Sequence, residues 1–290
     1  MTVSFIVITY LTGILVKYPD RQVHSSLKLE QHFNDDYRRL YLMDTVDCHG
    51  ALTNNSDSVR DAVAKSSLPS WQGFRIHDND ILHQTNSCTD FIRDRSYFMS
   101  SLSKLEADFP IAYSIMVFKD VEMVERLLRS VYRPQNYYCI HVDAKLNKDS
   151  TFYRAVAAIT SCFGNVFLTK ESVDVKWGEA SVLTPELFCM FDLWKFSWKY
   201  FINLTGQEFP LKTNRELVEI LMAMKGANDV EGNHNINLER WKWKGDPPHG
   251  ILPTKGAVHV VVNRHFVDFV LHDYRSQAFM EWLFGTGHPG

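Results

Sequence analysis

The sequence predicts an α/β fold in which a mostly parallel sheet is covered by helices on both faces and is preceded by a polar stem. From residue 109 onward, short continuous apolar runs alternate with segments whose apolar residues recur every three or four positions. This alternation is typical of buried parallel strands that are joined by helices. Residues 17–105, in contrast, are polar, rich in Asp, Asn, Ser and His, and only weakly periodic.

The first predicted strand is Ile111–Phe118, a continuous apolar run that follows Pro110. A helix is predicted over residues 120–132, because positions 121, 124, 127, 128 and 131 form one apolar face, and Pro134 stops it. Further strands are predicted at 137–142, 165–168 and 200–204, and further helices at 150–161, 178–198 and 213–225.

Parallel sheets bind ligands beyond the carboxyl ends of their strands. Asp143 directly follows the second predicted strand, so we expect a ligand site at Asp143 and at the loops after Phe118 and Leu168. No GxGxxG follows the first strand and no GxxxxGK[ST] occurs, so the sequence supports neither a dinucleotide fold nor a P-loop.

Composition limits the function only broadly. Hydrophobic residues make up 45% and charged residues 22% of the 290 residues, which is typical of globular proteins. The formal net charge of −3 gives no global attraction to nucleic acid. Aromatic residues make up 13%, which suits a site that stacks on rings or sugars but equally suits a large core.

The N-terminal segment, residues 1–17, is apolar until Lys17 and is interpreted as a signal anchor or a signal-like segment. A buried first strand is the alternative. The first basic residues of the N-terminal segment come after the apolar run, which is the wrong side for a type II anchor under the positive-inside rule. We expect a stem over residues 18–105 and the main domain over residues 106–290, and we interpret Asp78-Asn79-Asp80 as a turn in the stem.

Asn54 and Asn203 begin glycosylation sequons, and Asn54 is the better candidate because Asn203 falls at the end of a predicted strand. The five cysteines show no CxxC motif and no zinc-ligand spacing, so no metal site is expected. Each can be a buried free thiol. In an oxidising compartment, two pairs and one unpaired cysteine would be expected.

Four segments together resemble one family: FPIAYSIMVFKDVEMVERLL (109–128), RPQNYYCIHVDAK (133–145), SCFGNVF (161–167) and KYFINLTGQEFPLKTNRELV (199–218). They are similar to the core-2/I-branching β-1,6-N-acetylglucosaminyltransferases, a family that includes peptide O-xylosyltransferases. The resemblance extends from about Cys88 to Glu231 and resumes at Arg240. It implies a GT-A-like nucleotide-sugar fold in the Golgi lumen behind a membrane anchor, and inverting transfer from a UDP-sugar without metal or other cofactor.

The resemblance also implies roles for individual residues. Asp143 would hold uridine, and the alternative is a strand-end carboxylate that caps its own turn. Met116 and Phe118 would contact the base, although both are ordinary core residue types. Trp177 and Lys255 would lie at the rim of the donor site. Glu231 and Arg240 would bind the acceptor sugar, although the segment between them departs in length from the family, and both can be solvated loop charges.

The cysteines are assigned by the same resemblance. It implies disulfides between Cys88 and Cys162 and between Cys139 and Cys189, whereas the family partner of Cys48 lies in a C-terminal region. The last residues, AFMEWLFGTGHPG (278–290), resemble the segment that leads into the family's catalytic Pro-Asp-Glu. The general-base glutamate is therefore expected beyond Gly290, and the nearby Glu281 is not its counterpart.

The sequence thus predicts transfer of N-acetylglucosamine from UDP-GlcNAc to a galactose or N-acetylgalactosamine hydroxyl of an O-glycan. A chain that lacks its base would be a fragment of an active enzyme or an inactive remnant that binds UDP or glycans. A xylosyltransferase of the same family is the competing enzyme hypothesis, and a cytosolic α/β protein with free thiols is the least favoured one. The expected partners are a UDP-sugar, a glycoprotein acceptor and the Golgi membrane, with no nucleic acid.

Overall fold

The computed structural model describes residues 46–67, 76–232, 245–254 and 256–285. The chain divides into two compact units, Met1–Arg75 and Ile76–Gly290. The described part of the first unit forms two helices, α2 (Cys48–Leu52) and α3 (Ser56–Ser66). Asn55 caps α3, because its side-chain oxygen accepts hydrogen bonds from the backbone N–H groups of Asp57 and Ser58.

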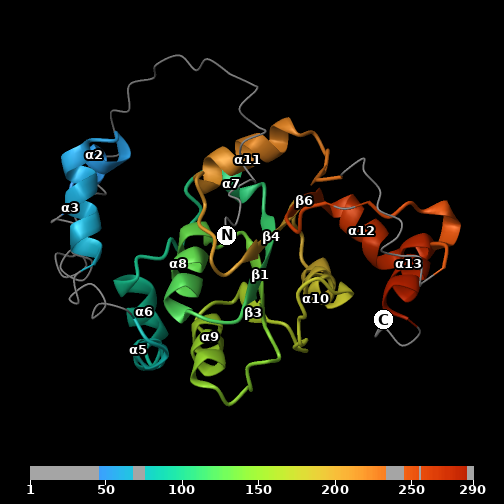
Figure 1. Ribbon diagram of the computed structural model, residues 1–290, viewed down its shortest axis with the longest axis horizontal. Helices are drawn as coiled ribbons and strands as arrows, with labels where there is room; N and C mark the ends of the chain where they lie inside the picture. The colour runs from blue at the N-terminus through green and yellow to red at the C-terminus, as the bar shows by residue number, and fades with distance from the viewer. Residues whose placement is uncertain (1–45, 68–75, 233–244, 255, 286–290) are drawn as a thin grey trace. The chain divides into compact units, whose positions relative to one another are not determined.

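The second unit is built on a six-stranded sheet with the order β3-β2-β1-β4-β6-β5 (Figure 1). The first four strands in this order are parallel, β6 is antiparallel to β4, and β5 is antiparallel to β6. The strands are β1 (Ile111–Val117), β2 (Tyr137–Val142), β3 (Val166–Leu168), β4 (Tyr200–Thr205), β5 (Asp229–Val230) and β6 (Val260–Asn263). The mostly parallel sheet predicted from the sequence is therefore confirmed.

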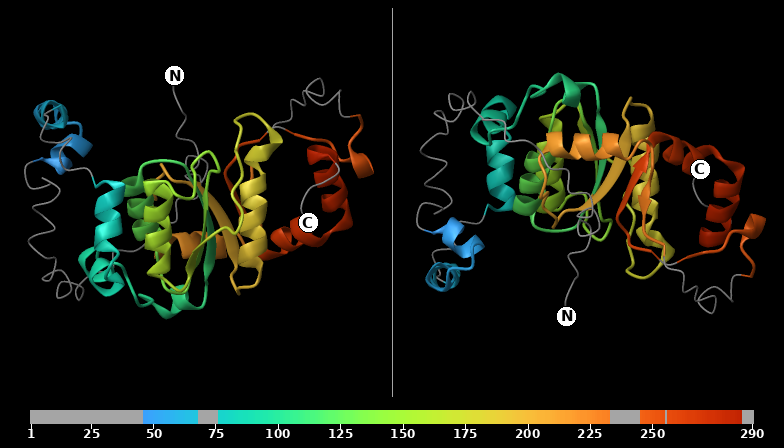
Figure 2. Two further views of the ribbon diagram at one scale, coloured as in Figure 1. Left: turned by 90° about the horizontal axis from the view of Figure 1, so that it is seen from below. Right: turned by 90° about the horizontal axis from the view of Figure 1, so that it is seen from above.

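Helices cover both faces of this sheet (Figure 2). The hydrophobic core on one face includes residues of α5 (Asp78–Gln84), α6 (Cys88–Asp94), α8 (Val121–Val131), α9 (Thr151–Ser161) and α11 (Asn214–Ala223). The core on the other face includes residues of α10 (Thr184–Trp194), α12 (Arg264–His272) and α13 (Tyr274–Phe284). Three short helices complete the described part of the unit, α7 (Lys104–Ala107), η4 (Ala180–Val182) and η6 (Pro248–Gly250).

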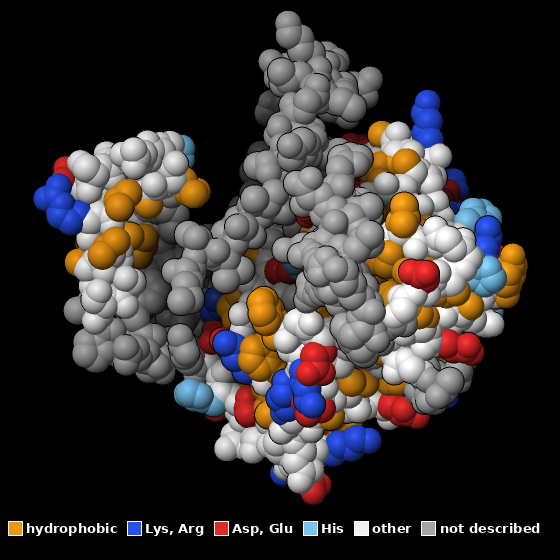
Figure 3. Space-filling view, turned by 45° about the vertical axis from the view of Figure 1, so that its right-hand side comes forward, with side chains coloured by type: hydrophobic (Ala, Val, Ile, Leu, Met, Phe, Trp, Pro, Cys, Tyr) orange, Lys and Arg blue, Asp and Glu red, His pale blue; other side chains and the backbone are white. Residues whose placement is uncertain are grey.

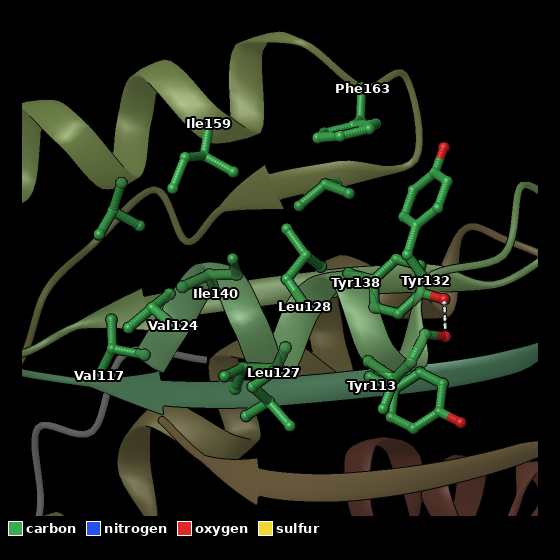
Figure 4. Packing of buried hydrophobic residues seen from close by; sticks show 14 of the residues in the cluster. Tyr113, Val117, Val124, Leu127, Leu128, Tyr132, Tyr138, Ile140, Ile159 and Phe163 are labelled. Carbon is green, nitrogen blue, oxygen red and sulfur yellow. Dashed lines mark hydrogen bonds between the residues drawn. The ribbon is translucent and has the colours of Figure 1, made fainter. Parts of the chain in front are cut away.

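The first core is rich in packed tyrosine rings. The rings of Tyr113 and Tyr138 stack with centroids 5.3 Å apart across the β1–β2 pair (Figure 4). The Tyr138 hydroxyl donates to the carbonyl of Val131, at 2.7 Å, and accepts from the backbone N–H of Arg133. Side chains alternate along β1, because Ile111, Tyr113, Ile115 and Val117 belong to this core whereas Ala112 belongs to the other.

Two local predictions are wrong. Asp78-Asn79-Asp80 is the first turn of α5 rather than a turn in a stem, and Asp80 accepts from the backbone N–H of His77 at 2.8 Å. Acidic residues are favoured in the first turn of a helix, because their carboxylates accept hydrogen bonds from the backbone N–H groups that have no partner within the helix. The single helix expected over 178–198 is η4 followed by α10, since Pro185 suits only the first turn of a helix.

The unit that contains the sheet begins within the range expected to be stem. Ile81 of α5 and Phe91 of α6 are buried in the first core. Across the described residues, no helix is both long and apolar enough to cross a membrane. The apolar segment 1–17 lies outside these residues, so its role as an anchor stays a prediction.

Candidate functional site

The strand directions gather several chain segments at one edge of the sheet. The parallel strands β3, β2, β1 and β4 all have their carboxyl ends there. The antiparallel register pairs Ile202 with Val261 and Val230 with Val260, so the start of β6 and the end of β5 lie at the same edge. Because β1 pairs with β2 on one side and with β4 on the other, the sheet order reverses there. Ligand sites of open α/β sheets lie at such a reversal.

Asp143 follows β2 at this edge and is 9% exposed. Its Oδ1 accepts from the backbone N–H of Lys145 at 2.9 Å, and its own N–H donates to the carbonyl of Val117. Its Oδ2 lies 3.6 Å from Lys145 Nζ, which also lies 3.5 Å from Asp174 Oδ1. One oxygen thus caps the turn, as expected of a strand-end carboxylate, while the other faces the ammonium group of a largely exposed lysine.

His141, two residues earlier, ties the loop after β3 to β2. Its Nε2 accepts from the backbone N–H of Val173 at 3.0 Å, and Ala144 N–H donates to the carbonyl of Val173. Burial lowers the pKa of His141 to about 4, against the opposing effect of the Asp143 carboxylate. The imidazole is therefore neutral at pH 7, with its proton assigned to Nδ1.

The loops after β2 and β3 enclose an open depression of about 640 Å³ beside Asp143. Lys145, Lys148 and Lys170 are among its lining residues, together with Glu171. The three lysines that line the depression offer positive charge for an anionic group, and Asp143, which lies next to Lys145, offers a carboxylate acceptor for a base or ribose.

The remaining donor-side candidates differ in how far they reach the surface. Met116 is partly buried against the second core, and its carbonyl accepts from the N–H of Gly206 at 2.9 Å. Phe118 is exposed, with Lys119 Nζ 5.0 Å from its ring centroid. Trp177 is 97% exposed, so its indole contributes almost nothing to the core and is available for stacking.

Close backbone packing brings the segment after β5 and the segment before β6 together. A Cβ added at Gly256 would lie 2.0 Å from the carbonyl oxygen of Glu231, so only glycine permits this approach. Glu231 is exposed and directly follows β5. It therefore lies at the edge that also holds Asp143. Lys255 and Arg240 lie outside the described residues, and their roles stay predictions.

A polar cluster at the carboxyl end of β4 was not found from the sequence. Glu186 of α10 is buried, and its Oε1 accepts from Asn203 Nδ2 at 2.5 Å. Asn203 Nδ2 also donates to the carbonyl of Val258, and Asn203 Oδ1 accepts from the N–H of Val260. Next to them, Glu208 Oε1 lies 3.0 Å from His259 Nε2.

The fold raises the pKa values of two side chains in this cluster. Burial raises the pKa of Glu186 to about 7, although the hydrogen bond from Asn203 and the nearby His259 oppose that shift. The hydrogen bond to Glu208 raises the pKa of His259. No motif marks these residues, because they come from α10, β4 and the segments flanking β4 and β6 and meet only in the fold.

The two disulfides implied by the resemblance are present. Cys88 at the start of α6 bonds Cys162 after α9, and Cys139 of β2 bonds Cys189 of α10.

Of the two sequons, Asn54 is exposed between α2 and α3. Asn203 is 3% exposed and its amide nitrogen donates to two internal acceptors, so the suggestion of a glycan there is wrong for the folded chain.

The family model described as Core-2/I-Branching enzyme matches residues 111–285. The chain belongs to the Core-2/I-Branching enzyme family. It is 38% identical to a β-1,3-galactosyl-O-glycosyl-glycoprotein β-1,6-N-acetylglucosaminyltransferase from Bos taurus, over 84% of this chain and 61% of that protein. The enzyme with the same name from Homo sapiens is 40% identical over 73% of this chain and 53% of its own length.

A third relative with this name, from Bovine herpesvirus 4, is 37% identical over 84% of this chain and 59% of its own length. The chain thus spans between half and two thirds of the length of these curated relatives. The matched range begins at the first residue of β1 and includes α12 and α13. The Core-2/I-branching resemblance and the GT-A-like fold class inferred from the sequence are therefore confirmed.

Charge on the visible surface is mixed. On the face drawn in Figure 3, Lys and Arg side chains are interspersed with Asp and Glu side chains rather than gathered in one field.

Among the described residues, no group of three or more His, Cys, Asp and Glu side chains is arranged to hold a metal ion. Metal-independent chemistry remains a prediction that this arrangement does not test.

Proposed function

We propose that this Core-2/I-Branching family chain forms the substrate-binding part of a β-1,6-N-acetylglucosaminyltransferase that acts on O-glycans. The reaction would move N-acetylglucosamine from UDP-GlcNAc to a sugar hydroxyl of a glycoprotein, with inversion and without a metal. The observation that carries the proposal is the single edge that holds Asp143, the lysine-lined depression and Glu231.

The donor would bind on the β1–β2–β3 side of that edge. Asp143 would accept hydrogen bonds from the uridine, while its Oδ1 continues to cap the turn through the N–H of Lys145. The exposed rings of Phe118 and Trp177 would pack against the base or the sugar. Lysine side chains around the depression would offset part of the negative charge of the diphosphate.

The acceptor would bind on the β4–β6–β5 side. Glu231 would accept hydrogen bonds from acceptor hydroxyls, and Arg240 would assist from outside the described residues. In the transfer step, the acceptor oxygen bonds to the anomeric carbon as the bond to UDP breaks, and a carboxylate base takes the hydroxyl proton. The proposal assigns that base to no residue of the described chain.

A Golgi location is part of the proposal. Two disulfides support an oxidising compartment, since such bonds are rare in reducing ones. An anchor formed by residues 1–17 would place the second unit in the lumen.

Binding and transfer can be measured on the same sample. The purified full chain is titrated separately with UDP-GlcNAc, UDP-xylose and a glycopeptide that carries a β-1,3-galactosyl-N-acetylgalactosamine O-glycan. We expect UDP-GlcNAc and the glycopeptide to bind, with UDP-xylose at least about tenfold weaker. Tighter binding of UDP-xylose would favour the xylosyltransferase branch, and failure to bind any UDP-sugar would contradict the proposal.

Mass spectrometry of the glycopeptide after incubation with UDP-GlcNAc then detects transfer. An added N-acetylhexosamine in β-1,6 linkage supports the transferase. Substrates that bind but stay unchanged agree with the proposed substrate-binding role and with a glycan-binding protein alike, because the proposal assigns the base to no described residue.

A further inference from the structure

Glu208 lies in the turn after β4 and makes two hydrogen bonds to the backbone of Thr205, the last residue of β4. Its Oε2 accepts from the backbone N–H of Thr205 at 3.0 Å, and its own N–H donates to the carbonyl of Thr205. The next residue after β4, Gly206, donates to the carbonyl of Met116 near the end of β1. A Cβ at Gly206 would lie 2.8 Å from a methyl carbon of Val117, so this turn is packed directly against the end of β1.

His259 lies immediately before β6, the strand that pairs with β4, and so lies at the same edge of the sheet as the turn after β4. Its Nε2 meets Glu208 Oε1 at 3.0 Å, and the two side chains are 28% and 31% exposed. The segment that contains His259 also contains Gly256, which packs against the backbone of Glu231. The Glu208–His259 bond therefore joins the end of the β1–β4 pair to the segment that supports Glu231.

The bond is supported from behind by buried polar groups. Asn203 holds the backbone of Val258 and of Val260, the two neighbours of His259, through its amide. Asn203 is itself bonded to Glu186 of α10. Because the backbone on both sides of His259 is held by these hydrogen bonds, the His259 side chain loses little further freedom when it bonds Glu208. The bond therefore links the turn after β4 to the segment before β6.

We infer that Glu208 and His259 are positioning residues that hold the acceptor-binding segment in register with the donor-binding edge. This inference rests on the proposed function. Neither side chain needs to touch the reacting atoms. The backbone pairing of β4, β6 and β5 places Glu231 near the end of β4, and the Glu208–His259 bond adds a side-chain link at that point. Loss of the pair should loosen the acceptor contacts and leave Asp143 in place.

The hydrogen bond to Glu208 raises the pKa of His259, so the imidazolium form is favoured by this contact and its charge is lost as pH rises through that pKa. The titratable groups that face His259 are Glu208 after β4 and Glu186 of α10. Acceptor affinity should therefore fall as pH rises through the pKa of His259. The pH dependence should be smaller in His259→Gln, which keeps an amide donor toward Glu208 but does not titrate there, and what remains is assigned to Glu186.

The test measures equilibrium binding of two probes, UDP-GlcNAc and the β-1,3-galactosyl-N-acetylgalactosamine glycopeptide, to the full chain. The variants are His259→Phe, Glu208→Gln and His259→Gln. The control is His272→Phe, because His272 and Asp268 form a similar exposed pair on α12, which begins at the opposite end of β6. Thermal unfolding of each variant checks folding, and NMR titration of His259 in the Glu208→Gln variant checks the pair itself.

We expect His259→Phe to weaken glycopeptide binding by about tenfold. Glu208→Gln, which keeps one oxygen for the imidazole N–H but loses the carboxylate charge, should weaken it less. UDP-GlcNAc affinity should change by less than about twofold in both variants. His259→Gln should retain more affinity than His259→Phe, and the control should match the wild-type chain. Unchanged glycopeptide affinity in both substitutions, or an equal loss for both probes, would overturn the positioning role. Failure of the wild-type chain to bind either probe would instead overturn the proposed function, and this inference with it.

Discussion

His141 shows how one buried side chain fixes the loop beside Asp143. Its Nε2 is the acceptor for Val173 N–H, and burial keeps its pKa at about 4. A Leu at position 141 would fill similar space but offer no acceptor. We expect His141→Leu to lower the free energy of unfolding at pH 7 by about 1 to 3 kcal/mol, as measured by urea unfolding.

The lowered pKa of His141 also predicts how the stability of the folded chain changes with pH. The folded pKa of His141 lies below the ordinary value of 6.5, so the stability that its neutral form contributes is complete above pH 6.5 and is lost as pH falls toward 4. The difference in stability between wild type and His141→Leu should shrink over that range. His83→Leu, at an exposed position on α5, serves as the control. A difference that stays constant from about pH 7 to about pH 4 would contradict this assignment.

At the scale of elements, α10 is attached to the sheet by a buried carboxyl group. The folded pKa of Glu186 is raised to about 7, above an ordinary value of 4.5. The folded chain therefore keeps a proton that the unfolded chain has lost, and stability falls as pH rises from about 4.5 to 7.

Glu186→Gln tests this attachment, because a glutamine carbonyl can still accept from Asn203 and cannot ionise. We expect the variant to match wild type near pH 4.5 and to be more stable by about 1 to 3 kcal/mol at about pH 8. Urea unfolding across this range measures the difference. A Gln variant that is less stable than wild type at both pH values would show that Glu186 is ionised in the folded chain.

The second attachment of α10 is covalent. The disulfide from Cys139 to Cys189 joins two fully buried positions that are 50 residues apart in the chain. Loop-closure entropy predicts a contribution of about 4 kcal/mol, since the crosslink restricts the unfolded chain. We expect the double substitution of Cys139 and Cys189 to alanine to lower the unfolding free energy by about that amount. An unchanged urea midpoint would contradict it.

At the scale of the whole molecule, hydrophobic periodicity was sufficient to predict the central strands. β1, β2, β3 and β4 are short apolar runs, and α8 has one apolar face, so their sequence signals are local. The break before α10 is marked in the sequence by Pro185. The start of α5 was missed because its Asp-Asn-Asp sequence is equally typical of a turn.

The candidate site was predicted only in part, for a physical reason. Asp143 carries a local signal, since it follows a buried strand, whereas Glu186, Glu208 and His259 depend on contacts between residues far apart in the chain. An isolated Glu within a helix pattern looks like a solvated residue. Only the hydrogen bond from Asn203 of β4 shows that Glu186 of α10 lies behind the site.

The redox state of the whole chain gives a further prediction. The two disulfides use four of the five cysteines, and the fifth, Cys48, has a side chain that lies outside the described part of the structure. Titration of the unfolded, unreduced protein with a thiol reagent should therefore find about one reactive thiol. Five thiols would contradict the disulfides and the oxidising compartment together.

The central claim is that the carboxyl edge of the sheet binds a UDP-sugar through Asp143. The most direct test is calorimetric titration of UDP-GlcNAc into the wild-type chain, Asp143→Asn and Asp149→Asn. Asparagine at position 143 keeps an oxygen for the N–H of Lys145, so the turn survives while the carboxylate is lost. Asp149 is an exposed control in the same loop.

We predict that UDP-GlcNAc binds the wild-type chain and Asp149→Asn equally and binds Asp143→Asn about tenfold or more weakly. Equal affinity of all three chains would contradict the claim.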